Sequence, residues 1–241
     1  MKKIIIFGGT SLISIELIKK FNLETEKFLV VCRSKNKFEN LIENFDDLLR
    51  KKIEIFEINL LNLNDNFSFI AKLEDHFYDG VFFLIGETGN PDVEFDNHIK
   101  CKENYDTNLI HPVLVINSLT KKLKENSFIC VFTSMAGLRG RAVRLYYCSA
   151  KAGLISYLSG LRQKLYKNNI SVINVIAGYM KTEKFTYKAN KFLINNPENI
   201  ALKIHKGIKK RKENIYTSYI WFMISILIRL IPEKIFTKLK F

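Results

Sequence analysis

Three residues of types that move protons and orient carbonyl groups lie close together in the sequence: Ser134, Tyr147 and Lys151. Tyr147 and Lys151 are four positions apart, so on a helix they share one face. A free tyrosine has a pKa near ~10, which is too high for efficient proton transfer at neutral pH. A neighbouring ammonium stabilises the phenolate and lowers that pKa, so Tyr147 is predicted to act as a general acid or base tuned by Lys151. A Tyr-x-x-x-Lys pair is common by chance, but Ser134 at the end of a predicted strand adds a hydroxyl that can polarise a substrate oxygen.

A second candidate site lies at the N-terminus, where a short apolar strand runs into the segment GGTSLIS, residues 8–14. A tight turn at this point lets backbone N–H groups and a helix N-terminus face a pyrophosphate. Leu12 and Ser14 occupy the second and third glycine positions of the usual motif, so the Leu12 side chain must point away from the phosphates. A tight turn without a ligand has the same appearance, and both interpretations stay open. The candidate cofactor-binding residues of this turn are Gly8, Thr10, Ser11, Leu12 and Ile13.

The end of the second predicted strand indicates which dinucleotide is bound. It reads Cys32-Arg33-Ser34, and the first carboxylate after it is Glu39. A free ribose 2′-hydroxyl usually meets an acidic residue here, whereas a 2′-phosphate needs a cation. Guanidinium pairs with phosphate through charge-assisted hydrogen bonds. Arg33 and Ser34 are therefore predicted to select NADP(H) over NAD(H), the alternative being a solvated loop arginine.

These residues must be positioned by an alternation of strands and helices. Continuous apolar strands separated by helices predict an α/β fold, a doubly wound parallel sheet of Rossmann-like type in a single domain. The predicted strands are Lys3–Phe7, Phe28–Cys32, Ile53–Ile58, Val81–Ile85, Phe128–Thr133 and Val172–Ile176. The predicted helices are Ser11–Phe21, Asn36–Leu49, Phe67–Phe77, Lys100–Lys124 and Tyr146–Asn168.

Composition narrows the class of protein. The chain has 241 residues, 47% of them hydrophobic, which is enough for a real core and argues against intrinsic disorder. Its four cysteines are far apart, which argues against a disulfide framework or a metal site and suits a reducing compartment. The first apolar run is too short for a secretory segment, so a cytoplasmic location is expected. The net charge of +14 suits phosphorylated ligands or an anionic membrane. Without a nucleic-acid motif, no nucleic-acid partner is expected.

Together the motifs resemble the short-chain dehydrogenase/reductase family over residues 3–190. The resemblance implies an NAD(P)-dependent oxidoreductase acting on a CH–OH group. It implies that Tyr147 donates or accepts the proton, that Ser134 holds the substrate oxygen, and that Lys151 also binds the nicotinamide ribose. Asn108, in the segment ENYDTN, matches the asparagine of the family's proton relay. The resemblance assigns further cofactor contacts to Gly86, Tyr147, Gly178 and Thr182. Many members of the family are homo-oligomers, so a homo-oligomer is expected here.

The sequence departs from the family pattern at three places, namely the glycine turn, Phe83–Gly86 and Ala177-Gly178. With the segments LIGETGN and SMAGLRGR, these departures resemble the branch of polyprenyl-phosphoryl ketopentose reductases and other reductases of cell-envelope polysaccharide synthesis. The expected substrate is a lipid- or nucleotide-linked sugar. The alternatives are a 3-oxoacyl thioester or small ketone, or a catalytically silent nucleotide-binding protein. Arg139, Arg141 and Arg144 lie beside the expected substrate mouth, as phosphate ligands or as a solvated loop.

The C-terminal segment changes in composition, so residues 1–190 are predicted to form the catalytic domain and residues 191–241 a helical extension that is apolar and basic. Tyr216–Ile231 is apolar but shorter than the about 20 residues of a membrane span. Its aromatic side chains suit an interfacial helix on the inner face of a membrane carrying anionic lipid, as do the basic residues Lys206–Lys212, Lys234, Lys238 and Lys240. The alternative is a helix buried on the core or on a partner subunit.

Overall fold

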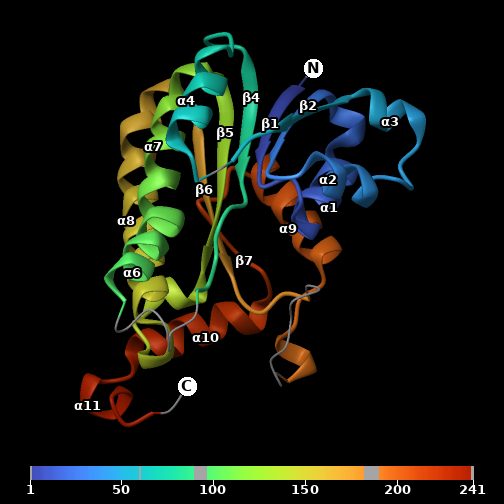
Figure 1. Ribbon diagram of the computed structural model, residues 1–241. Helices are drawn as coiled ribbons and strands as arrows, with labels where there is room; N and C mark the ends of the chain where they lie inside the picture. The colour runs from blue at the N-terminus through green and yellow to red at the C-terminus, as the bar shows by residue number, and fades with distance from the viewer. Residues whose placement is uncertain (1, 60, 90–96, 182–189, 240–241) are drawn as a thin grey trace.

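The fold was determined as a computed structural model that describes residues 2–59, 61–89, 97–181 and 190–239. Its centre is a seven-stranded, wholly parallel sheet of order β3-β2-β1-β4-β5-β6-β7 (Figure 1). The predicted doubly wound α/β fold is confirmed. The strands are β1 (Lys2–Phe7), β2 (Thr25–Cys32), β3 (Ile53–Glu57), β4 (Tyr78–Phe83), β5 (Leu123–Ser134), β6 (Ser171–Ala177) and β7 (Asn214–Tyr216).

Helices cover both faces of the sheet, because alternate residues of each strand point to opposite sides. Ile4 and Ile6 of β1 pack in one core cluster, and Ile5 and Phe7 pack in the other. The first face is covered by α1 (Leu12–Phe21), α2 (Lys35–Leu41), α3 (Asp47–Lys51) and α9 (Pro197–Lys209). The second is covered by α4 (Leu63–Ala71), α6 (His98–Tyr105), α7 (His111–Leu119) and α8 (Leu145–Leu165), as Figure 1 shows.

Two predicted helices are divided in the structure. The predicted helix Asn36–Leu49 is split into α2 and α3, because the Asp46 carboxylate caps a new helix by accepting from the Leu49 N–H at 2.8 Å. The predicted helix Lys100–Lys124 is interrupted by one π-helical turn, Asp106–Ile110, between α6 and α7. Pro112 has no N–H to give to the carbonyl of residue 108, and the His111 N–H bonds the Asp106 carbonyl five residues back.

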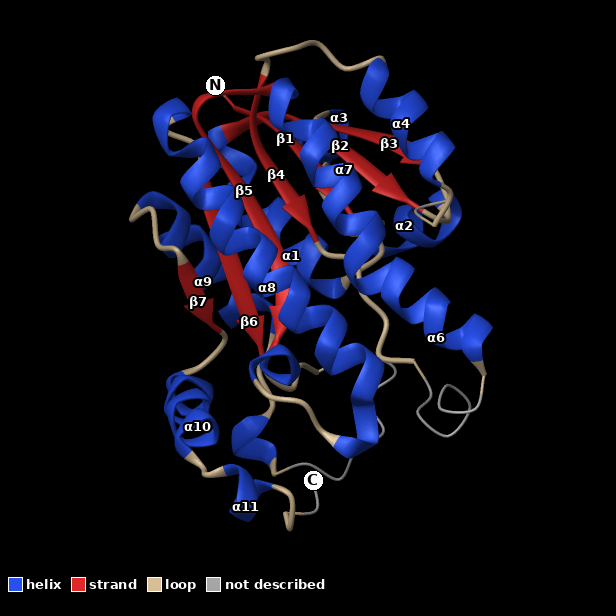
Figure 2. Cartoon of the chain, turned by 90° about the vertical axis from the view of Figure 1, so that its left-hand side faces the viewer, coloured by secondary structure: helices blue, strands red, loops and turns tan. Residues whose placement is uncertain are grey.

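The C-terminal part of the chain divides between the sheet and an extension. Helix α9 packs against α1, and β7 pairs with β6, so residues 197–216 complete the layers of the sheet domain. The strand β7 was not predicted, because three residues, Asn-Ile-Tyr, are too short to show a periodicity. After it come α10 (Tyr219–Leu230) and α11 (Glu233–Phe236), which lie beyond the carboxyl ends of the strands (Figure 2).

Candidate active site

The turn after β1 is built for close approach to a ligand. Gly8 has φ +94°, a backbone conformation that residues with a side chain rarely adopt. A Cβ at this position would lie 3.2 Å from the Leu84 carbonyl carbon. The backbone N–H groups of Gly8 and Gly9 each donate to the Val31 carbonyl at 3.0 Å. Ser11 caps α1, with its Oγ accepting from the Ile13 N–H. The N-terminus of α1 is therefore fixed beside the end of β1, where it favours an anion.

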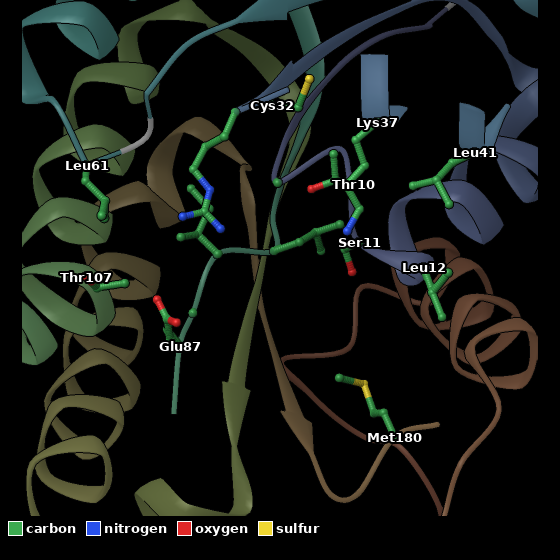
Figure 3. Close-up of a pocket in the computed structure, with 15 residues that line it drawn as sticks. Thr10, Ser11, Leu12, Cys32, Lys37, Leu41, Leu61, Glu87, Thr107 and Met180 are labelled. Carbon is green, nitrogen blue, oxygen red and sulfur yellow. The ribbon is translucent and has the colours of Figure 1, made fainter. Parts of the chain in front are cut away.

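The two substituted glycine positions are accommodated differently. Ser14 is fully buried, and its hydroxyl donates to the carbonyls of Gly9 and Ser11, so a small side chain fits between helix and strand. Leu12 is half-buried on the α1 side of the cavity, apart from the Thr10 and Ser11 hydroxyls (Figure 3). The departure from the usual glycine pattern thus leaves the turn open to a pyrophosphate.

A cavity of about 380 Å³ lies along the carboxyl edge of the sheet at this turn (Figure 3). Six predicted cofactor residues line it: Gly8, Thr10, Ser11, Leu12, Arg33 and Gly86. Five others do not line it, and two of these, Tyr147 and Lys151, belong to the catalytic group described below. Ile13 is buried in the core, Ser34 caps α2 by accepting from the Lys37 N–H, and Gly178 packs against Trp221. Thr182 lies outside the described residues.

Lys37 was not among the predicted cofactor-binding residues. This lysine lines the cavity, and its side chain reaches from α2 toward Thr10 and Ser11 (Figure 3). Glu57, the carboxylate nearest to this region in β3, accepts from the backbone N–H of Lys35 at 2.7 Å, and Glu39 lies 3.8 Å from the Lys35 ammonium. The end of the cavity at β2 therefore presents two cations, Arg33 and Lys37. The sequence pattern that could have indicated it is the N-cap of α2: Ser34 caps the helix, and Lys37 follows three residues later in its first turn.

Ser134, Tyr147 and Lys151 are brought together by the end of β5 and the start of α8. The hydroxyl groups of Ser134 and Tyr147 are hydrogen-bonded to each other, and the Lys151 ammonium lies 5.7 Å from the centre of the Tyr147 ring. The turn Met135–Leu138 packs tightly on α8, since a Cβ on Gly137 would be 2.8 Å from the Lys151 carbonyl carbon. Close backbone packing thus fixes the spacing between the serine and the tyrosine.

Gly86 lies between Lys151 and Asn108. A Cβ at Gly86 would come 2.8 Å from Lys151 Nζ and 3.3 Å from Asn108 Oδ1. Asn108 is fully buried in the π-helical turn; its Oδ1 accepts from the Glu87 N–H at 3.1 Å, and its Nδ2 donates to the Glu87 carbonyl at 2.8 Å and to Asn104. The four residues predicted for catalysis therefore gather at one place on the carboxyl edge of the sheet.

Comparison with known proteins agrees with this geometry. The family model described as short chain dehydrogenase matches residues 2–191. The chain belongs to the short-chain dehydrogenase family. Its members are NAD(P)-dependent oxidoreductases, and so is this chain.

Individual relatives of this short-chain dehydrogenase are distant. Nodulation protein G of Rhizobium meliloti is 24% identical over 173 residues, 68% of each chain. Ketoacyl reductase HetN of Nostoc is 27% identical over 118 residues, which span 46% of this chain and 41% of HetN. Among solved structures, BdcA in complex with NADPH has a TM-score of 0.75 at 14% identity, covering 90% of this chain and 93% of BdcA. A short-chain dehydrogenase/reductase from Vibrio parahaemolyticus has a TM-score of 0.72 at 19% identity, covering 88% and 97%.

The electrostatics of the short-chain dehydrogenase site differ from the prediction. Burial raises the pKa of Tyr147, while its hydrogen bond to Ser134 and the charges of Arg141 and Arg144 lower it. Lys151, which was predicted to lower this pKa, is not among the groups that do so here, and burial outweighs the favourable charges of the arginines. Burial also lowers the pKa of Lys151 itself to about 8.

The three arginines after β5 do not act as one group. Arg139 is bound by the C-terminal extension: its guanidinium donates to the carbonyls of Ile228, at 2.9 Å, and Ile231, and lies 2.6 Å from the Glu233 carboxylate. Arg144 donates to the carbonyls of Thr88 and Gly89. A phosphate site formed by all three is therefore wrong, because protein acceptors already hold two of them.

The extension forms one wall of the site region. Trp221 of α10 packs with Met135 and Ile176, and its indole N–H donates to the Leu193 carbonyl at 2.9 Å. A Cβ on Gly178 would lie 2.0 Å from the Trp221 ring, so this position requires glycine for close packing. The helix that follows the sheet thus touches the segments after both β5 and β6.

The basic run 206–212 is not part of the surface formed by α10. Lys209 lies 2.6 Å from the Glu24 carboxylate, just before β2, and Arg211 bonds Asn126 near the start of β5. These contacts lie at the amino edge of the sheet, while α10 lies at the carboxyl edge. The prediction that the run and the apolar helix face the same lipid surface is wrong, because β7 carries the chain from one edge to the other.

Proposed function

We propose that this short-chain dehydrogenase uses NADP(H) to interconvert a carbonyl and an alcohol on a lipid- or nucleotide-linked sugar of cell-envelope polysaccharide synthesis. The observation that carries the chemistry is the convergence of Ser134, Tyr147, Lys151 and Asn108 beside the cavity at the Gly8 turn. The branch of polyprenyl-phosphoryl ketopentose reductases supplies the substrate class, supported by the apolar extension at the same edge of the sheet.

The residues of the cavity suit a dinucleotide. Beside the cavity, next to Gly86, Lys151 is 2% exposed as a residue and its ammonium has no hydrogen-bond acceptor among the described residues, so a ribose hydroxyl would supply one. Gly86 leaves the space above it that a Cβ would fill. The turn at Gly8 and Ser11 would hold the pyrophosphate, and Arg33 and Lys37 would hold the 2′-phosphate. When bound, the nicotinamide supplies or accepts the hydride.

The chain's own groups would manage the substrate oxygen. Ser134 donates a hydrogen bond that polarises and orients the carbonyl, and Tyr147 gives its phenolic proton to that oxygen as the alcohol forms. The arginine charges favour the phenolate left behind. Asn108 holds the segment at Gly86 and Glu87 against the π-helical turn, so it positions the wall opposite Lys151.

The first test is Tyr147→Phe. The variant lacks the transferable proton, so NADPH oxidation with a panel of sugar, acyl and simple ketones is expected to fall by roughly 100-fold or more. NADPH affinity, followed by its fluorescence, is expected to persist in the variant. Equal turnover by both proteins would refute the role of Tyr147. Absence of turnover in the wild type with every ketone would favour the catalytically silent alternative.

Cofactor choice is tested by Arg33→Asp. Loss of the guanidinium and gain of a carboxylate are expected to weaken NADPH affinity by about tenfold or more, because charge-assisted hydrogen bonds are lost, and to improve NADH affinity. The matched control is Lys35→Asp, since Lys35 makes the same charge change nearby without lining the cavity. NADPH affinity that falls equally in both variants would show a general charge effect.

A second candidate function is reduction of a 3-oxoacyl thioester. It is favoured by the match to a protein named ketoacyl reductase. The same ketone panel separates the two functions, because an acyl thioester reductase would prefer a 3-oxoacyl substrate over every sugar ketone.

We also propose that α10 attaches the protein to the inner face of an anionic membrane. Within this twelve-residue helix only Trp221 and Ser225 are buried. Its exposed apolar side chains are Tyr219, Ile220, Phe222, Met223, Ile226, Leu227 and Leu230. Arg229, Lys234 and Lys238 add positive charge, and the acidic Glu233 is paired with Arg139. None of the described helices has the length and apolar content to cross a bilayer. The competing occupant of this face is a second copy of the chain, in a homo-oligomer.

A further inference from the structure

Arg141 is distinguished from its two neighbouring arginines by the lack of a protein partner. Its side chain makes no hydrogen bond or ion pair with any described residue, and its Nε is buried without an acceptor. Leaving a charged donor unpaired in this way is costly, so a folded protein usually supplies an acceptor. Arg141 as a whole is half-buried and only its Nε is buried, so the two terminal guanidinium nitrogens stay accessible to an acceptor on a ligand.

The backbone holds Arg141 in a defined position. Its conformation is extended, with φ −134° and ψ 139°, and its carbonyl accepts from the Arg144 N–H at 3.0 Å. Arg144 is itself bound to the carbonyls of Thr88 and Gly89, and Arg139 two residues earlier is bound to the extension. The loop is therefore fastened on both sides of Arg141, and its guanidinium is the one left for a ligand.

The position of Arg141 relates it to the substrate and separates it from the cofactor. It lies in the loop that joins the end of β5, at Ser134, to the start of α8, which carries Tyr147, and its charge favours the ionised form of the Tyr147 hydroxyl. It does not line the cavity formed by Gly8, Ser11 and Arg33. An anion bound by Arg141 would therefore belong to the molecule whose carbonyl meets Tyr147.

We infer that Arg141 binds a phosphate group of the carbonyl substrate and so selects phosphorylated over neutral ketones. A planar guanidinium offers paired N–H donors that match phosphate oxygens. The inference rests on the proposed function and narrows it, because lipid-linked and nucleotide-linked sugars both carry phosphate next to the sugar.

The test uses inorganic pyrophosphate as the probe, titrated calorimetrically into the full chain saturated with NADPH at low ionic strength. Saturation keeps the probe out of the cofactor's own phosphate sites. The wild type is expected to bind pyrophosphate, and Arg141→Ala to bind it about tenfold or more weakly, with Arg141→Lys between them. Lys212→Ala is the matched control, since it removes one exposed charge at the opposite edge of the sheet and should bind as the wild type does.

Several outcomes would overturn the inference. They are absence of pyrophosphate binding to the wild type, equal affinity in wild type and Arg141→Ala, an equal loss in Lys212→Ala, or malonate binding as tightly as pyrophosphate. NADPH affinity and circular dichroism of Arg141→Ala serve as the folding check, and Arg141→Lys gives the answer if the alanine variant fails to fold. Because the titration needs no turnover, its result is separate from the ketone panel. If the wild type binds pyrophosphate, Arg141→Ala loses that binding, and the wild type reduces no ketone, the proposed function fails and the anion site stands.

Discussion

Lys151 is a buried residue, 2% exposed, and burial lowers the pKa of its ammonium group from the ordinary value of 10.5 to about 8. Between these two pH values the unfolded chain keeps the proton while the folded chain releases it, so the stability of the protein should rise with pH. Below pH 8 both states are charged, and the full cost of burying the charge remains. The residue best placed to meet the cofactor thus destabilises the fold at neutral pH.

The predicted rise of stability with pH can be measured with Lys151→Met, which removes the titrating group and keeps most of the side-chain volume. The stability advantage of the variant over the wild type is expected to shrink by about 2 kcal/mol between pH 7 and pH 9.5, an order-of-magnitude value from the two pKa values above. Urea unfolding at both pH values gives the free energies. An advantage that is constant with pH, or one that grows, would contradict a lowered pKa at Lys151.

At the scale of single elements, the π-helical turn Asp106–Ile110 is the one that serves the site most directly. It interrupts the helix at Asn108, whose amide bonds both backbone groups of Glu87 and also Asn104. Single-turn π-helices are often found at functional sites. Here the turn fastens the segment after β4 next to Lys151.

Asn108→Ala should therefore be strongly destabilising. It removes the acceptor of the Glu87 N–H and the donors to Glu87 and Asn104, and it empties the space of a fully buried side chain, at an expected cost of roughly 3 kcal/mol in the free energy of unfolding. Asn117→Ala on α7 is the control. Among the described residues its exposed side-chain amide accepts one hydrogen bond, from the Tyr157 hydroxyl, so a cost of about 0.5–1.5 kcal/mol is expected. Equal losses of unfolding free energy for the two substitutions, measured by urea unfolding, would contradict the prediction that the Asn108 hydrogen bonds stabilise the fold strongly.

The sequence predicted the sheet, its first six strands and the approach of Ser134 to Tyr147 and Lys151, because these depend on local periodicity and short spacing. It did not predict that α6 and α7 are separated at Asn108, since hydrophobic periodicity continues across a π-turn. The partners of Arg139 were hidden for another reason: they lie about ninety residues later in the chain. Spacing in the sequence places three arginines near Ser134, but it does not tell which of them is bound by another element.

At the scale of the whole molecule, the carboxyl edge of the sheet gathers the cavity, the catalytic group and the apolar extension, while the basic run 206–212 is bound at the amino edge. Arg139 joins two of these parts, because it holds the α10–α11 junction and follows the turn after Ser134. A membrane bound by α10 would therefore lie next to the turn that follows Ser134. This arrangement suits a substrate that is presented at a membrane.

Flotation with liposomes containing phosphatidylglycerol tests this arrangement. The paired change Leu227→Asp and Leu230→Asp puts two carboxylates on the exposed face of α10, where these side chains are 60% and 72% exposed, and should remove most of the flotation of the wild type. The control is Leu23→Asp with Leu48→Asp, two similarly exposed leucines on the sheet domain at 97% and 75%, which should float as the wild type does. Light scattering on the same proteins measures their oligomeric state and so tests the alternative, in which a second copy of the chain covers α10. A dimer that dissociates only in the α10 variant, together with no flotation of the wild type, would assign this face to a second copy of the chain.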